Sequence, residues 1–271
     1  MRAAYSAGAL ATLVEYGFEG VFDHVVGSSA GAMNGAYFLA SQADAVETYT
    51  DDISNKNFVN LTRKDKRVDI DYLVDVALLQ KRPLKIDRLL KTHSRLHLVL
   101  TDAQTGKSFV ISDHQKFVQI YEEMRATAAL PILYDKKIVL NGKEYVDGGV
   151  SNLLPIDIAV SLGCTDIIVI MTQQISSYRF DLRHRRLINH LIRKLARNQS
   201  KKVQDILPTN EKALKANLKL ATHPPKAINI YTLQPSNEEY LISTATIDKE
   251  KVKELAKLGV LDMEEFLHYH I

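Results

Sequence analysis

The chain has 271 residues, of which 46% are hydrophobic and 25% charged; these proportions exclude a disordered chain, a collagen and a coiled coil. Its 35 Lys and Arg against 32 Asp and Glu leave a formal charge of +3, too small by itself to indicate a nucleic-acid partner. Cys164 is the single cysteine, which excludes an internal disulfide framework and an all-cysteine metal cluster and suits a reducing compartment. Because α/β enzymes of this length often share one core, one large domain is expected.

The N-terminal segment has two interpretations. Met1-Arg2 followed by the uncharged run 3–14 imitates a secretory signal, with Ala7-Gly8-Ala9 as a candidate cleavage site. The same run carries apolar residues on one helical face and is followed by Gly17, which favours an amphipathic helix. A second uncharged stretch, 25–43, is nearly long enough to cross a bilayer but is interrupted by glycine, serine and asparagine. We therefore predict a cytoplasmic protein that is at most peripheral to a membrane.

Strand-like and helix-like segments alternate along the chain, which is typical of an α/β sheet covered by helices. A short apolar run at 22–26, a glycine and a helical pattern at 30–40 predict a strand, a sharp turn and a helix. The polar, mixed segment 44–95 predicts helices and loops that form a cap or an insertion. Further strands are expected at 96–101, 108–111, 137–140, 144–146, 166–171 and 227–233. Helices are expected at 115–129, at 155–162 and at 179–221, the last with a break at Pro208, and two short helices are expected to close the chain. The pair Asn141-Gly142 predicts a hairpin.

The segment Gly27-Ser28-Ser29-Ala30-Gly31 fits the pattern G-x-S-x-G, with Ser29 in the position of a nucleophile. A serine on a tight strand-to-helix turn is exposed at the edge of a sheet, and glycines are expected two residues to either side because side chains there would collide with the turn. The amides of the following helix, beginning with Ala30, would face the negative charge that develops on an acyl oxygen. The alternative is a Ser/Gly-rich turn that only links a strand to a helix.

A serine nucleophile needs a base within about 2.6 to 3.2 Å. Histidine is the usual base, in the chain order Ser, Asp, His. Asp147 directly follows the predicted hairpin strand, and Gly148 and Gly149 after it let the backbone pass close to another element; the alternative is an ordinary turn aspartate. The histidines beyond Asp147 lie at no obvious strand-end turn and are interpreted as surface residues: His184, His190, His223, His268 and His270.

Together the two motifs resemble the patatin-like phospholipase family, in which a G-x-S-x-G serine and the aspartate of an Asp-Gly-Gly or Asp-Gly-Ala motif form a catalytic dyad without histidine. The resemblance includes Arg2 with the helix after it, the segment Ala126 to Pro131, the strand pair around 101–107 and the run 145–155, and it fades past about residue 230. It implies a three-layer α/β/α fold with a central, mostly parallel sheet. The implied organisation is an acyl hydrolase domain over 1–230, with the cap or insertion at 44–95, and a C-terminal extension, 231–271, packing on the same domain.

The resemblance also implies acyl transfer on phospholipids or lysophospholipids. Asp147 would take the proton as Ser29 attacks the ester carbonyl, and water activated by the same carboxylate would hydrolyse the acyl-enzyme. No metal or organic cofactor is expected. Two alternatives are an α/β-hydrolase-type esterase with a Ser-His-Asp triad and a catalytically silent module that binds lipid surfaces. The residues expected to shape the turns or the oxyanion site are Ala30, Gly27, Gly31, Gly148, Gly149 and Arg2.

One departure from the family pattern concerns the N-terminus. In the family a β-strand and a Gly-Gly-rich loop precede the arginine, and the loop donates amides to the oxyanion, whereas this sequence begins at Met1-Arg2 and has Ala3 where glycine is usual. We expect Met1 to be an internal methionine of a longer reading frame, or a deliberate truncation. Since losing one oxyanion donor costs about 10² to 10³ in rate, a chain that starts at Met1 is expected to be weakly active or inactive.

The segment from Arg179 to Lys202 concentrates positive charge, with nine Lys and Arg against one acid, Asp181. Leucines and an isoleucine recur in it at helical spacing, so the pattern predicts an apolar stripe beside a cationic face. Such a helix can lie on anionic lipid, to which each cation contributes about 1 kcal/mol. The alternative is a solvated helix with its stripe on the core. Nucleic acid is not expected as a partner, because aromatic residues do not interleave with these cations.

Overall fold

The computed structural model describes residues 1–114, 117–178, 196–207 and 211–270. The strands are β1 (His24–Ser28), β2 (Arg95–Asp102), β3 (Ser108–Ile111), β4 (Ile138–Leu140), β5 (Lys143–Asp147), β6 (Asp166–Ile170) and β7 (Asn229–Leu233). The α-helices are α1 (Ala4–Glu15), α2 (Ala30–Leu39), α3 (Ala45–Glu47), α4 (Ile86–Lys91), α5 (Phe117–Ala128), α6 (Ile156–Ser161), α8 (Lys201–Ile206), α9 (Glu211–Thr222) and α10 (Lys249–His270). Short helical turns are η1 (Phe18–Gly20), η4 (Gly148–Val150), η5 (Ile175–Ser177) and η6 (Glu238–Tyr240), and two π-helical segments are η2 (Thr48–Asp52) and η3 (Tyr72–Lys81).

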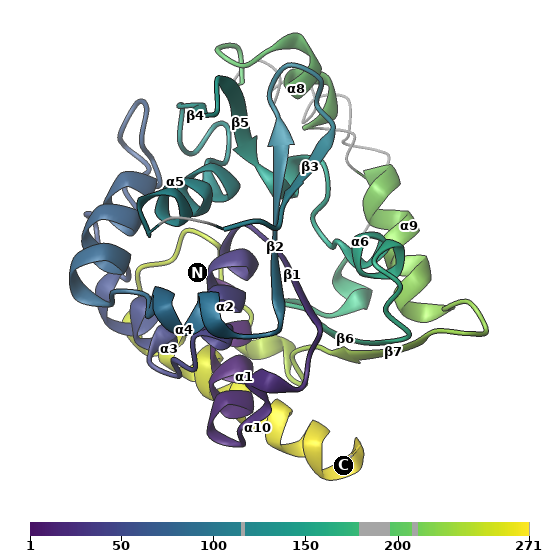
Figure 1. Cartoon of the computed structure of the whole chain (residues 1–271). Coiled ribbons are helices and arrows are strands. Elements are labelled where there is room, and N and C mark those ends of the chain that lie inside the picture. Colours follow the sequence, from purple (N-terminus) through teal and green to yellow (C-terminus); the bar gives the residue numbers. More distant parts are fainter. Residues whose placement is uncertain (115–116, 179–195, 208–210, 271) are drawn as a thin grey trace.

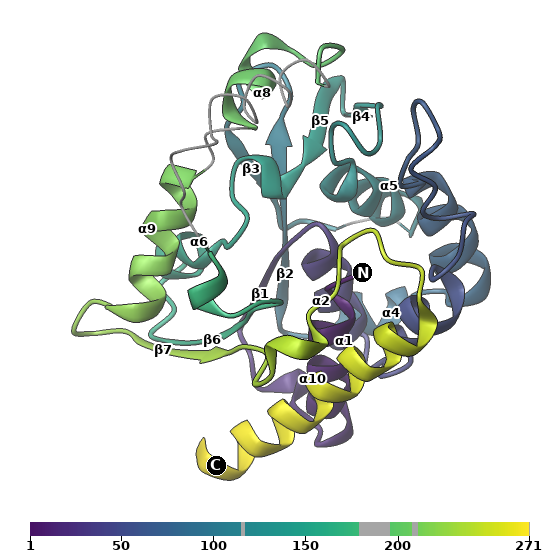
Figure 2. The same cartoon turned by 180° about the vertical axis from the view of Figure 1, so that it is seen from behind.

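Helices cover both faces of the strands, with α1, α2, α5 and α10 on one side and α6 and α9 on the other (Figures 1 and 2). The predicted three-layer α/β/α class is confirmed. In the described residues, β1 to β5 form a mixed five-stranded sheet, and β6 and β7 form a separate two-stranded sheet. The parallel pairs are β1 with β2 and β6 with β7, while β2 pairs antiparallel with β3 and β5, and β5 with β4. The antiparallel β2–β3 and β4–β5 pairs are hairpins; the parallel pairs are joined by longer crossovers, as parallel geometry requires.

The register of β2 determines where the ends of β1 and β5 lie. β3 occupies one edge of β2 from Leu98 to Thr101. Ser28, the last residue of β1, lies opposite Val99, and Asp147, the last residue of β5, lies opposite Leu100. Because β3 occupies the other edge at these positions, β1 and β5 share one edge of β2 and end at consecutive positions along it.

Local sequence signals account for several element boundaries. Asn141 and Gly142 have φ of 50° and 76°, the left-handed pair that a two-residue hairpin turn requires, so the predicted hairpin is confirmed. Gly163 follows α6 with φ of 87°, as a helix-terminating glycine does. The first strand differs from its prediction at 22–26: β1 begins at His24 and continues through Gly27 to Ser28, because its pairing with β2 extends up to the turn.

The prediction that two short helices close the chain is wrong, because one of the two elements is α10, a helix of 22 residues. Gly259 is a poor helix former in the middle of α10, but the close packing of α10 on α1 requires a residue without a side chain there. A Cβ added at Gly259 would lie 2.0 Å from the carbonyl oxygen of Tyr5, and one added at Gly8 would lie 2.1 Å from that of Ala256. Glycine therefore allows α1 and α10 to cross backbone against backbone. Of the helix predicted at 179–221, residues 179–195 and Pro208 lie outside the described part, and α8 and α9 lie within it.

The largest hydrophobic cluster of the described residues joins segments that are distant in sequence. Leu98 of β2, Tyr5 of α1, Val74 in the predicted cap or insertion and Leu255 of α10 all belong to it and are almost completely buried. Segment 44–95 thus packs on the same core as the central strand. β7 spans the predicted boundary between residues 230 and 231, and the division into a domain and an extension stays a prediction.

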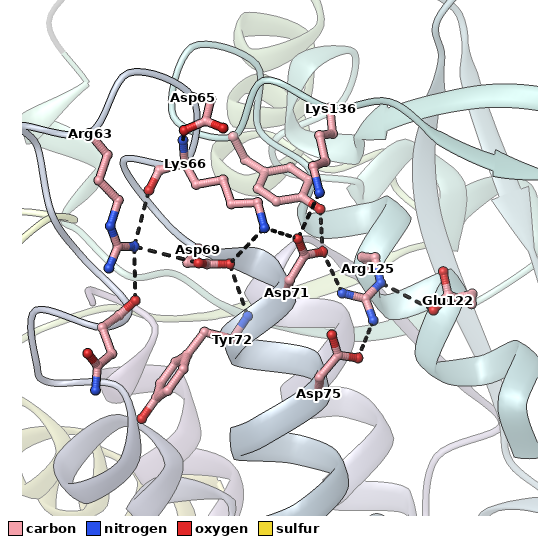
Figure 3. A network of polar contacts seen from close by, with 12 residues as sticks. Arg63, Asp65, Lys66, Asp69, Asp71, Tyr72, Asp75, Glu122, Arg125 and Lys136 are labelled. Atoms are coloured by element: carbon pink, nitrogen blue, oxygen red, sulfur yellow. Dashed lines mark hydrogen bonds and ion pairs between the residues drawn. The ribbon is translucent and has the colours of Figure 1, made fainter.

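A polar network ties segment 44–95 to α5 (Figure 3). Arg125 on α5 is 8% exposed and donates to Asp71 at 2.8 Å, to Asp75 at 2.5 Å and to Glu122 at 3.2 Å. Burial alone would raise the pKa of Asp71, but hydrogen bonds from Lys66, from the hydroxyl of Tyr134 and from Lys136 together lower it. The network therefore fixes α5 against the η3 segment through charge-assisted bonds that are partly protected from water.

Over the described ranges, no helix combines the length and the apolar character needed to cross a bilayer.

The crossing of α1 and α10 can be tested by adding single methyl groups. We expect Gly8→Ala and Gly259→Ala each to lower the free energy of unfolding by about 1 to 3 kcal/mol, because the new Cβ overlaps a backbone carbonyl. Gly20→Ala is the matched control, since a Cβ there meets no atom within 4 Å, and it should change stability by less than about 0.5 kcal/mol. Urea titration measures all three, and wild-type stability in both helix variants would contradict this packing.

Candidate active site

Ser29 lies on the sharp turn between β1 and α2. Its φ of 55° and ψ of −128° are strained for a residue with a side chain. Gly27 makes the turn possible, because a Cβ there would lie 2.5 Å from the backbone nitrogen of Ala32. Gly31 differs: a Cβ added there meets no atom within 4 Å, and the residue lies on the exposed side of α2. The expected steric reason for glycine therefore applies at Gly27 and does not apply at Gly31.

The side chains of Ser29 and Asp147 meet at the shared edge of β2. The Ser29 hydroxyl donates to Oδ2 of Asp147 at 2.7 Å. The other carboxylate oxygen, Oδ1, accepts from the backbone amide of Gly149 at 2.7 Å, so both oxygens have a donor. Asp147 is only 3% exposed. The structure thus brings together a hydroxyl and a buried carboxylate that are 118 residues apart in sequence.

Burial dominates the electrostatics of Asp147. Removal of the carboxylate from water raises the pKa of Asp147 to about 6, and the hydrogen bonds from Ser29 and Gly149 oppose this shift only in part. The carboxylate is therefore mostly ionised at neutral pH but is more basic than an exposed aspartate. That combination suits a group that must accept a proton near pH 7.

The two glycines after Asp147 have different structural roles. A Cβ on Gly148 would lie 2.0 Å from the carbonyl oxygen of Val99 and 2.7 Å from Oγ of Ser28, so the chain passes β2 at a distance that only glycine allows. At Gly149 the corresponding contacts are longer, 3.0 Å to Oδ1 of Asp147 and 3.2 Å to Leu153. Gly149 contributes mainly its amide, which orients the carboxylate.

Two fully buried threonines hold the backbones of the pair, and sequence reasoning missed both. Oγ1 of Thr127 accepts from the Ser29 amide at 2.9 Å and donates to the Val99 carbonyl at 2.6 Å. Oγ1 of Thr101 donates to the Asp147 carbonyl at 2.8 Å and accepts from the Ser151 amide at 3.1 Å. No motif marks these threonines as functional, although the resemblance included the segments that contain them, the strand pair around 101–107 and Ala126 to Pro131.

The N-terminus of α2 begins directly after Ser29. The carbonyl of Ser29 accepts from the amide of Ala32 at 3.0 Å, while the amides of Ala30 and Gly31 belong to the first turn, where a helix offers no acceptor of its own. Their N–H groups and the helix dipole favour negative charge at this end. Arg2 donates to the side-chain oxygen of Gln173 in the loop after β6, so its hydrogen bond ties it to that loop and not to the carboxylate of Asp147.

Within the described residues, the histidines beyond Asp147 have neighbours other than Ser29 and Asp147. His184 and His190 lie outside the described residues. His223 is exposed and contacts Thr222, while the rings of His268 and His270 pack against aromatic side chains of the C-terminal region. Within the described ranges, no three or more His, Cys, Asp or Glu side chains form a group that could hold a metal ion.

Comparison with known proteins identifies the family of the chain. The model of the patatin-like phospholipase family matches residues 1–160, a stretch that contains β1, the turn at Ser29, α5 and Asp147. A similar protein is the uncharacterized protein YjjU of Escherichia coli (strain K12), 26% identical over 179 residues. That match covers 63% of this chain and 49% of the relative, so the chain matches about half of the relative's length. Because the family model matches more than half of the chain, the chain belongs to the patatin-like phospholipase family.

Proposed function

We propose that the protein is a serine acyl hydrolase that cleaves carboxylic ester bonds of phospholipids or lysophospholipids through an acyl-enzyme. Membership of the family implies a hydrolase that acts on lipid esters. The observation that carries the finer proposal is the 2.7 Å hydrogen bond from the hydroxyl of Ser29 to the buried carboxylate of Asp147. In this proposal Ser29 is the nucleophile and Asp147 the general base, and a histidine is not needed.

The first step forms the acyl-enzyme. Oδ2 of Asp147 accepts the hydroxyl proton as Oγ of Ser29 attacks the ester carbonyl carbon, and the carbonyl oxygen takes up the negative charge. The carboxyl group then returns the proton to the departing alcohol or lysophospholipid oxygen as the ester bond breaks. The Gly149 amide holds Oδ1, which leaves Oδ2 directed at the reacting hydroxyl.

The second step regenerates the enzyme by the same proton path. A water molecule gives its proton to Asp147 and attacks the acyl carbonyl, and the proton passes to Oγ of Ser29 as the acyl group leaves as a carboxylic acid. In both steps negative charge develops beside the N-terminus of α2. The Ala30 amide is the proposed donor to this oxygen, supported by its place in the first turn of that helix.

Substitution of the two side chains tests the assignment. We expect Ser29→Ala to abolish labelling by a fluorophosphonate probe, and Ser29→Ala and Asp147→Asn each to lower kcat/KM on a p-nitrophenyl ester by about 10³-fold or more. Ser28→Ala is the matched control at the adjacent serine, whose buried Oγ has no hydrogen-bond partner among the described residues. It should be labelled like the wild type.

Two outcomes would contradict the assignment. Labelling that persists in Ser29→Ala would place the nucleophile elsewhere, and rates that survive Asp147→Asn would remove the base. A folded wild-type protein that the probe does not label at all would favour the catalytically silent lipid-binding module.

The pKa of Asp147 predicts the pH dependence of the reaction. Because kcat/KM reports the free enzyme, it should rise as the carboxyl group loses its proton, with a midpoint near pH 6, and level off above pH 7. A neutral ester with a short acyl chain serves as substrate, so that only the enzyme titrates. A midpoint near pH 4 would show that the carboxylate is solvated in the working enzyme.

The same group makes a prediction for stability. A carboxyl pKa that is raised on folding stabilises the fold below the unfolded pKa of 3.8, and this stability is lost as pH rises through about 6. Asp147→Asn removes the buried charge, so it should raise the free energy of unfolding at pH 8 by up to roughly 3 kcal/mol relative to wild type, and by much less at pH 4. Urea titrations at the two pH values measure the difference. An equal effect at both would contradict the burial of an ionised carboxylate.

The basic segment from Arg179 to Lys202, most of which lies outside the described residues, is proposed to contact anionic membranes. Its charge of nine cations against one acid supports this, since each cation near anionic lipid contributes about 1 kcal/mol. We expect the protein to sediment with vesicles that contain phosphatidylserine and not with vesicles of phosphatidylcholine alone. Equal binding to both would remove the electrostatic contact.

A further inference from the structure

We propose that Thr127 is a positioning residue that holds Ser29 in its strained, reactive conformation through its side-chain hydroxyl. The inference rests on the proposed function, because it assigns a role in placing the proposed nucleophile. In this inference Thr127 acts through the backbone of Ser29. Its hydroxyl contacts the backbone of the nucleophile and a strand carbonyl.

Both hydrogen-bonding capacities of the Thr127 hydroxyl are used. The oxygen accepts from the Ser29 amide at 2.9 Å, and the proton is donated to the Val99 carbonyl at 2.6 Å. Thr127 has no exposed surface, so water cannot replace either bond at that position. Without the hydroxyl, the buried Val99 carbonyl and the part-buried Ser29 amide would both lose this hydrogen-bond partner, and leaving such groups unpaired is unfavourable.

The hydroxyl acts where β1 and β2 separate. The last registered pair of the two strands is Ser28 with Val99, and after it the chain turns away at Ser29 with φ of 55°. The amide of Ser29 precedes the first helical residue of α2, so the helix supplies no acceptor for it. The Thr127 hydroxyl therefore lies between the Ser29 amide and the Val99 carbonyl and bonds both. The chain can turn away from β2 at Ser29 because the Ser29 amide still has a hydrogen-bond acceptor.

The end of α5 also holds the other half of the pair. The carbonyl of Ala129, two residues after Thr127, accepts from the Asp147 amide at 3.0 Å. The segment 127–129 is thus bonded to the backbones of both Ser29 and Asp147. Arg125, two residues before Thr127, anchors this end of the helix to Asp71 and Asp75 (Figure 3). A helix fixed in this way can hold the two side chains at hydrogen-bonding distance.

Substitutions at Thr127 separate the hydroxyl from the methyl group. Thr127→Val keeps the shape and removes the hydroxyl, and Thr127→Ser keeps the hydroxyl and removes the methyl group. A displacement of about 1 Å in a nucleophile can cost about 10²-fold in rate, so we expect Thr127→Val to lower kcat on a p-nitrophenyl ester by about 10 to 10²-fold with KM changed less than about 3-fold. The rate of fluorophosphonate labelling should fall in parallel, and Thr127→Ser should restore both to within about 3-fold of wild type.

A second pair of variants and a control keep the test independent of folding defects. Thr127→Ala and Thr127→Ser both lack the methyl group and differ only in the hydroxyl, so their ratio of kcat carries the test if Thr127→Val fails to fold. Thr12→Val is the control for the loss of a buried threonine hydroxyl, since Thr12 is 1% exposed and its hydroxyl donates to the carbonyl of Gly8, at 3.3 Å, within its own helix. It should lower the melting temperature and leave kcat unchanged.

The outcomes distinguish this inference from the proposed function. If Ser29→Ala abolishes activity while Thr127→Val and Thr127→Ala keep wild-type kcat, the positioning role is overturned and the nucleophile stands. If Thr127→Ser is as slow as Thr127→Ala, the hydroxyl is not the active feature and the inference is also overturned. If Ser29→Ala keeps activity, the proposed function itself fails, whatever the Thr127 variants show.

Discussion

The arrangement of the site depends on the register of one strand. β2 receives the end of β1 at Val99 and the end of β5 at Leu100, along the same edge. Because strand pairing fixes the positions of the backbones, Ser29, which follows β1, and Asp147, which ends β5, are held near each other by backbone hydrogen bonds alone. A shift of β5 by one residue would turn Asp147 to the other face of the sheet and separate it from Ser29. The 2.7 Å contact is therefore a consequence of sheet pairing more than of attraction between the two side chains.

Burial gives Asp147 its chemical character and imposes a cost on the fold. A carboxylate that is 3% exposed loses most of its hydration, and two hydrogen bonds compensate only part of that loss, which is why its pKa rises. A third donor would lower the pKa again and make the group a weaker base. The site thus has the number of donors that orients the carboxylate while leaving it basic, at the expense of stability at neutral pH.

Much of this arrangement could be predicted from the sequence where local chemistry decides it. The Asn141-Gly142 turn and the glycine-flanked serine after an apolar run follow from backbone rules that act over a few residues. The parts that could not be predicted depend on contacts between distant segments. The length of α10 was not predicted, because the reason that its Gly259 is tolerated is a close contact with Tyr5, about 250 residues away. The steric expectation failed at Gly31 because which side of α2 faces solvent is decided by packing.

The threonines illustrate the same limit at the site. A threonine in a helix is unremarkable in sequence, and only the fold shows that the hydroxyl of Thr127 lies between an amide of one strand end and a carbonyl of the next. Strain at Ser29 can persist only if its surroundings determine its conformation from several directions. Here the Gly27 backbone packs against Ala32 on one side, Thr127 holds the amide on another, and the first turn of α2 binds the carbonyl. These three contacts restrain the backbone at Ser29, because a change to an unstrained φ and ψ would have to break at least one of them. The backbone therefore keeps the conformation in which the hydroxyl of Ser29 is directed at Asp147.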